Sequence, residues 1–127
     1  MTINEINSNY FIADGQLISI KIDYNSDINS LTSATVVIKI RKKIGTKKTM
    51  EAILQLFFTE LILIDIIESF DSTFYSDIKL LLLDNGEYYL SLDPFDNSEI
   101  PNNNDNFKIK ARTLNITELE KENISNN

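Results

Sequence analysis

The segment Asp84-Asn85-Gly86 constrains the fold of this chain more than any other feature of its sequence. It separates two apolar runs, 78–83 and 87–92, and Asn-Gly between such runs is the strongest short-range signal for a β-hairpin. Both residues tolerate the left-handed backbone conformation of a type I′ turn, so we expect a two-residue turn of that type. This hairpin sets the register of two antiparallel strands around which the rest of the fold is built.

Alternation of apolar and polar residues predicts further strands on both sides of the hairpin. The period of two is clear over residues 17–24, 34–41 and 107–112, which indicates half-buried strands. Asn, Asp, Ser and Thr gather between the first two of these, so 25–33 is expected to be a loop. The segment 42–46 contains one glycine and is expected to be a hairpin turn that reverses the chain after the strand 34–41.

The segment 47–69 is compatible with two kinds of structure. We favour two strands broken near 58–60, because 61–67 is dense in β-branched Ile, which packs well on a pleated sheet. The alternative is a short helix near residues 49–58, with Thr49 as its cap.

Taken together, the strand signals predict a mainly β, single-domain protein. A chain of 127 residues has the size of one ordinary domain. We expect residues 1–116 to form an antiparallel β-sandwich or rolled barrel of about seven to eight strands. The polar segment 117–127 is expected to be a frayed tail.

The absence of two residue types limits the chemistry that the chain can perform. It has neither Cys nor His, which excludes disulfides, serine triads and zinc sites of the usual kind. We therefore expect a protein that is not an enzyme and uses no cofactor. The first residues lack the basic start and apolar run of a secretory signal, which favours a cytoplasmic protein.

Charge is divided unevenly along the chain. Residues 1–50 carry seven Lys or Arg against four Asp or Glu, whereas 51–127 carry five against fifteen. The overall charge of −7 repels a nucleic-acid backbone, so nucleic acid is not expected as a partner. The longest apolar stretch, 50–70, is interrupted by Glu51, Gln55, Glu60, Asp65 and Glu68, so we expect no membrane-spanning helix and no membrane partner.

The segment 93–106 is the longest predicted loop and the best candidate for a binding site. It holds both prolines and four acidic residues, and it should lie at the surface with a mobile tip. Tyr88 and Tyr89, which precede this segment, are neighbours on a predicted strand and so project to opposite faces of the sheet. One of them is expected in the core, and the hydroxyl of the other is then available for binding. Our candidate partner-binding residues are Asp93, Asp96, Glu99, Asp105 and Tyr89. The same acids could instead hold Ca²⁺, although their spacing fits no EF-hand.

Residues 50–113 resemble small bacterial proteins found in toxin–immunity gene neighbourhoods. The segments that carry this resemblance are 74–79, 87–96 and 105–110. The resemblance implies an immunity-type inhibitor that binds a cognate toxin and has no chemistry of its own. The partner would be a protein, for example a basic toxin domain, because an acidic protein neutralises a basic one by complementary potential. Two alternatives stay open: a C2-like module that binds calcium or lipid, and a structural subunit that pairs through a strand edge.

Overall fold

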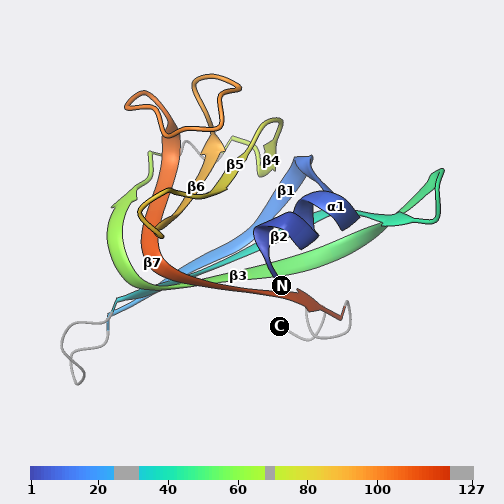
Figure 1. Cartoon of the computed structure of the whole chain (residues 1–127), viewed down its shortest axis with the longest axis horizontal. Helices are drawn as coiled ribbons and strands as arrows, with labels where there is room; N and C mark the ends of the chain where they lie inside the picture. The colour runs from blue at the N-terminus through green and yellow to red at the C-terminus, as the bar shows by residue number, and fades with distance from the viewer. Residues whose placement is uncertain (25–31, 68–70, 121–127) are drawn as a thin grey trace.

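The computed structural model describes residues 1–24, 32–67 and 71–120. Within them, seven antiparallel strands form one sheet that curls into a half-barrel, and a short helix lies against it (Figure 1). The strand order is β4-β1-β2-β3-β7-β6-β5. The elements are α1 (Ile3–Asn9), β1 (Tyr10–Asp23), β2 (Ser33–Ile44), β3 (Lys48–Asp65), β4 (Phe74–Tyr75), β5 (Lys79–Leu82), β6 (Tyr88–Asp93) and β7 (Asn106–Leu119). The predicted mainly antiparallel β fold is confirmed, and the observed architecture is the rolled sheet.

The hydrophobic core fills the inside of this curl. In the centre of the sheet Val36 pairs with Leu56 and Ile38 with Leu54, and all four side chains are fully buried. Ile6 of α1 is also fully buried in the same cluster. Alternation along the strands therefore gives the sheet one apolar face, and the helix helps to cover it.

Strand β3 runs without a break through the segment that was hardest to predict. The alternative of a helix near 49–58 is wrong, and so is the favoured break near 58–60. Glu60 has a φ of 53°, and the pairing with β7 shifts register between Leu61 and Leu63. The feature at this position is a β-bulge, which bends a strand without ending its pairing. Figure 1 shows β3 curving around the end of the half-barrel.

The hairpin at Asp84-Asn85-Gly86 pairs β5 with β6 as predicted. The predicted type I′ turn is wrong, because such a turn needs a positive φ at both central residues. Gly86 has a φ of 88°, but Asn85 does not have a positive φ. Leu83 N–H donates to the Glu87 carbonyl at 2.8 Å, and Gly86 N–H donates to the Leu83 carbonyl at 2.9 Å. This is a three-residue loop in which a β-turn is followed by a left-handed glycine, the next commonest hairpin after the two-residue forms.

The first sixteen residues contain ordered structure that the sequence analysis did not predict. Helix α1 begins after an N-cap residue, Thr2, whose Oγ1 accepts a hydrogen bond from the Glu5 N–H at 3.1 Å. Strand β1 follows at once and starts at Tyr10, well before residue 17. A register shift and a φ of 54° at Asp14 interrupt the alternation of apolar and polar residues in β1, so its first half was not predicted as a strand.

The other boundaries differ from expectation in smaller ways. A hairpin joins β2 to β3 as predicted, but its turn lies at 45–47 and not at 42–46, because β2 continues to Ile44. Strand β7 continues to Leu119, so its pairing with β3 extends into the expected tail. Tyr24 follows the end of β1 and is 84% exposed, not buried. Most of the expected loop 25–33 and the end of the tail, 121–127, lie outside the described residues.

Candidate functional site

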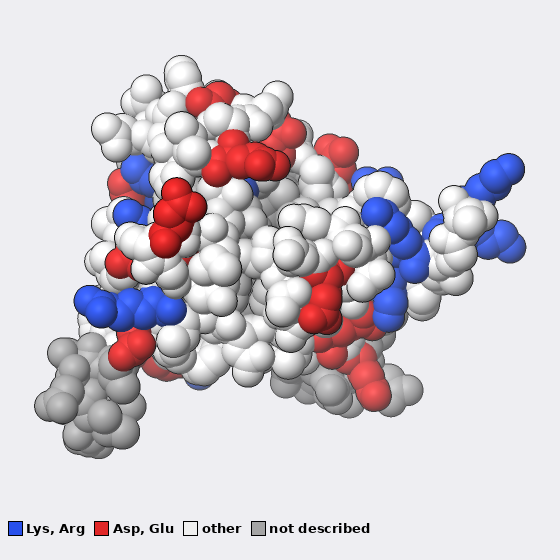
Figure 2. Space-filling model, in the orientation of Figure 1, with Lys and Arg blue, Asp and Glu red and all other residues white. Residues whose placement is uncertain are grey.

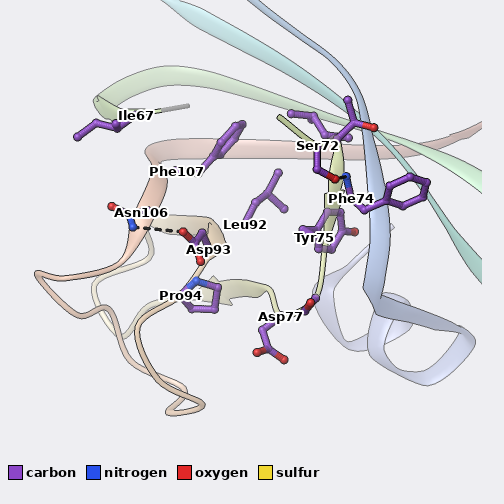
Figure 3. A pocket seen from close by; sticks show the side chains of 13 residues that line it. Ile67, Ser72, Phe74, Tyr75, Asp77, Leu92, Asp93, Pro94, Asn106 and Phe107 are labelled. Carbon is purple, nitrogen blue, oxygen red and sulfur yellow. Dashed lines mark hydrogen bonds between the residues drawn. The ribbon is translucent and has the colours of Figure 1, made fainter. Parts of the chain in front are cut away.

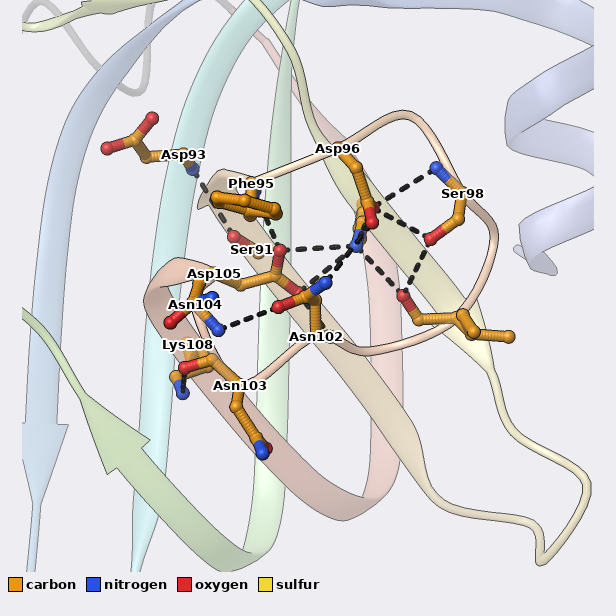
Figure 4. A network of polar contacts seen from close by, with 12 residues as sticks. Ser91, Asp93, Phe95, Asp96, Ser98, Asn102, Asn103, Asn104, Asp105 and Lys108 are labelled. Atoms are coloured by element: carbon orange, nitrogen blue, oxygen red, sulfur yellow. Dashed lines mark hydrogen bonds and ion pairs between the residues drawn. The ribbon is translucent and has the colours of Figure 1, made fainter.

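The loop that joins β6 to β7 (residues 94–105) covers the outer face of the sheet at β5 and β6 (Figure 4). Leu90 of β6 faces the core, so its neighbours Tyr89 and Ser91 face outward. Ser91 is the cross-strand partner of Lys79 on β5. All of these outward-facing side chains are nevertheless buried. This part of the sheet is therefore covered on both faces, by the core inside and by the loop outside.

The carboxylate of Asp105 organises the loop. Its Oδ1 accepts hydrogen bonds from Lys79 Nζ at 3.1 Å and from the Phe95 N–H at 2.8 Å. Its Oδ2 accepts from the Tyr89 hydroxyl at 2.7 Å and from the Asn102 N–H at 2.8 Å. The side chain is fully buried, and both of its oxygens are satisfied by the chain itself.

The ammonium of Lys79 lies beside this carboxylate and is only 3% exposed. It also donates to Asp96 Oδ1 and to the carbonyl of Ile100, each at 2.8 Å. Three donors thus meet three acceptors from three parts of the loop. A buried charge is tolerated when it is paired and hydrogen-bonded in this way.

The carboxylate of Asp96 extends the network toward the tip of the loop. It accepts from the hydroxyl of Ser98 at 2.7 Å and from the backbone N–H of Ser98 at 3.2 Å. Its second oxygen accepts from Asn102 Nδ2 at 3.2 Å. The two arms of the loop are therefore joined to each other as well as to the sheet.

The pKa values of these groups follow from burial and from their partners. Burial acts to raise the pKa of Asp105, but the hydrogen bonds from Tyr89, from two backbone N–H groups and from Lys79 outweigh it and lower that pKa. Burial acts to lower the pKa of Lys79, and the hydrogen bonds and charges of Asp96 and Asp105 raise it overall. Burial and the bond to Asp105 both raise the pKa of Tyr89. The network is therefore in its ion-paired form at neutral pH.

Three of the five candidate binding residues meet in this network, namely Tyr89, Asp96 and Asp105. Asp93 and Glu99 lie outside it and are exposed, and Asp93 accepts a bond from Asn106 Nδ2 at 3.2 Å. Tyr89 and Asp105 are each 2% exposed, so neither can touch a partner in this conformation. Their role in the loop is to position it.

The residue that the sequence analysis missed is Lys79. It is the only charged residue in the apolar run 78–83, which was treated as an ordinary strand. Lysine is almost never fully buried unless it is paired. A lysine inside such a run therefore signals a buried cation that needs acidic partners, although it does not say which acids supply them.

The outer side of the loop presents a different chemistry from its inner side. Phe95 and Ile100 are 64% and 66% exposed. Figure 2 shows acidic side chains gathered over this end of the molecule and basic ones at the protruding tip of the β2–β3 hairpin. Exposed apolar side chains among acids are suited to binding a basic protein surface.

A cavity of about 560 Å³ opens beside the base of the loop (Figure 3). It lies between β4, the end of β6 and the start of β7. Leu92, Phe107 and Tyr75 form part of its wall, and Asp77 and Asp93 are among the residues that line it. The cavity has room for a side chain of a bound partner, with carboxylates available to a cationic end.

The arrangement of acids at this site also bears on cation binding. The Lys79 ammonium bonds to both Asp96 and Asp105, so it occupies the space between the two carboxylates that a bound cation would need. No group of three or more acidic residues in the described part of the chain could hold a metal ion. In the same residues no helix is long and apolar enough to cross a membrane.

Comparisons with known proteins add no family to this description. No family model, no curated protein and no solved structure matches the chain.

Proposed function

We propose that this protein is a non-catalytic protein-binding domain, an immunity-type inhibitor of a cognate bacterial toxin, and that the loop 94–105 is the centre of its contact surface. The observation that carries the proposal is the buried pair of Lys79 and Asp105, which holds a long loop in one shape while Phe95 and Ile100 stay exposed. A loop ordered before binding loses less conformational entropy when a partner docks. A surface that is already ordered is therefore well suited to inhibiting another protein.

The charge of the loop indicates the class of partner. Asp93 and Glu99 are exposed, and Asp96 is partly exposed. A basic toxin domain would be attracted to these carboxylates before contact, which raises the association rate at low salt. The exposed apolar side chains would then contribute to the lifetime of the complex.

The resemblance of residues 50–113 to toxin–immunity proteins supports the same partner class. The proposal divides the five candidate residues into two roles. Asp93, Asp96 and Glu99 contact the partner, and Tyr89 and Asp105 keep the loop in its binding shape.

The decisive experiment first identifies the genes on either side of the one for this chain and then measures binding to any toxin domain that they encode. The absence of such a domain would contradict the proposal. Association rates would be recorded over a salt series for the native protein and for the double variant D93N/E99Q. We expect the variant to associate about tenfold more slowly at low salt and to show a weaker salt dependence.

A matched control removes the same charge at two positions outside the loop, in the turn at the opposite end of β6 and after β7. Asp84, in the β5–β6 turn, and Glu120, after β7, are both exposed, so D84N/E120Q has the same net charge as the test variant. It should associate at nearly the native rate. Equal effects of the two double variants would show that the overall charge, and not the loop, attracts the partner. An absence of binding by the native protein would refute the proposed function.

A further inference from the structure

The second half of β1 has no described strand paired with its outer edge. β1 lies next to the end of the sheet, and the terminal strand β4 pairs with it only at Gly15 and Gln16. From Ile18 to Asp23 no described strand lies on this side of β1, whereas β2 pairs with the other side as far as Asp23. Unpaired backbone donors and acceptors along such an edge form a template for another strand.

The apolar face of this edge continues the core face of the sheet. Ile20 and Ile22 are the cross-strand partners of Val36 and Ala34, which are both fully buried. Directly opposed residues share a face, so the two isoleucines also face the core side. Ile22 is nonetheless 40% exposed, because nothing in the described chain covers it. A strand added at this edge would bury it.

The other face of the same edge carries one charge of each sign. Lys21 and Asp23 form an ion pair at 3.7 Å within β1, and their side chains are 73% and 53% exposed. They are two residues apart and therefore point to the same face. Antiparallel pairing of two copies about Ile22 would place Lys21 of each copy opposite Asp23 of the other. The same register sets Ile22 against Ile22 and Ile20 against Tyr24, which is 84% exposed.

We propose that the 20–24 edge of β1 pairs antiparallel with the same edge of a second copy, to form a two-fold symmetric dimer with one continuous sheet. A two-fold interface must be self-complementary, and this segment has that property in both charge and apolar surface. Centring the pairing on Lys21 would oppose two lysines. A shift by one residue would turn the isoleucines to the opposite face from their partners in the other copy.

The test is a concentration series in analytical ultracentrifugation with charge-reversal variants. The native chain should show a concentration-dependent dimer. Lys21→Asp and Asp23→Lys should each raise the dimer dissociation constant about tenfold, because each replaces two attractive cross-strand pairs by two repulsive ones. The double variant K21D/D23K restores opposite charges at both positions and should recover dimerisation to near the native level. Lys47→Glu, on the tip of the β2–β3 hairpin, is the control and should dimerise like the native chain.

A label experiment tests the register independently. The chain has no Cys, so Ile22→Cys and Thr46→Cys each offer one position for a nitroxide. We expect dipolar broadening of the spectrum for the label at 22, which sits on the symmetry axis, and none for the label at 46. A native chain that stays monomeric at all concentrations would overturn the proposal. So would single charge variants that dimerise normally, a double variant that is not rescued, or equal spectra from the two labels. Circular dichroism of each variant verifies that the sheet is intact.

Discussion

The loop 94–105 and the end of the β2–β3 hairpin, residues 41–50, reach their shapes by different means. In the hairpin, backbone pairs such as Lys43 with Thr49 and Ile44 with Lys48 hold the two arms together. Its side chains do not hold the two arms to each other. Lys42 pairs with Glu118 of β7, and Arg41 and Lys43 lie over the ring of Phe11 of β1. All five of its charged residues are cations: Arg41, Lys42, Lys43, Lys47 and Lys48. A backbone ladder thus allows a segment to be ordered and strongly charged at once.

The loop 94–105 has no ladder and no glycine. Its order depends on side chains, above all on Asp105, whose carboxylate bonds to the sheet through Lys79 and to the loop through two backbone N–H groups. Side chains that hold a loop together are not available to a partner. The comparison therefore predicts that single side-chain changes alter the loop strongly and the hairpin weakly.

The largest effect should come from Asp105→Asn. Asparagine keeps the size of the side chain but removes the fully buried one of the two carboxylates that pair with the ammonium of Lys79. Breaking one partner of a buried pair costs about 3 kcal/mol, and we expect a loss of that order in the free energy of unfolding measured with urea. Asp93→Asn, at an exposed carboxylate beside the same loop, is the control and should change stability by less than about 0.5 kcal/mol.

A double-mutant cycle with Lys79→Met separates pairing from the simple loss of a polar group. The double variant K79M/D105N leaves no buried charge unpaired, because the remaining carboxylate, Asp96, is 40% exposed. It should therefore be more stable than the sum of the two single losses predicts. Additive losses would mean that Lys79 and Asp105 do not stabilise each other. The loop would then owe its order to other contacts.

Protonation of Asp105 at low pH should weaken the same network, with a smaller effect on stability than the substitution Asp105→Asn. The folded-state pKa of Asp105 is lowered, so its contribution is fully present above the unfolded value of about 3.9 and is lost as pH falls through the folded value. The stability difference between the native protein and D105N should therefore shrink as pH falls toward about 2. Urea midpoints of both proteins over this range provide the measurement. A difference that stays constant would argue against an ionised Asp105.

The loop and the hairpin also differ in how far the sequence could predict them. Alternation and Gly45 were sufficient for the β2–β3 hairpin, because its shape follows from local pattern and turn chemistry. The sequence showed which residues of the loop are acidic. It did not show that Asp105 turns inward while Asp93 and Glu99 stay exposed. That choice depends on Lys79, which is twenty-six residues away from Asp105 along the chain. No local pattern encodes such a contact.

Bulges explain most of the remaining errors in the fold. Extra residues in one strand of a pair break the period of two. Between Phe11 and Gln16, β1 has three more residues than the part of β2 that it faces, so the first half of β1 was missed. A one-residue bulge led to the predicted division of β3 near Glu60. In each case the backbone continues to pair on both sides of the irregularity, which only the folded partner strands reveal.

The smallest effect is expected in the hairpin, at Gly45. This residue has a φ of 62°, and a Cβ placed there would meet no atom within 4 Å. The cost of Gly45→Ala therefore comes from backbone conformation alone, which we expect to lower the free energy of unfolding by about 1 kcal/mol. Gly45→Asn is the matched comparison and should cost less, because Asn tolerates the left-handed region better than Ala. A loss of unfolding free energy for Gly45→Ala as large as that for Asp105→Asn would contradict the comparison. The hairpin would then not be held mainly by its backbone ladder.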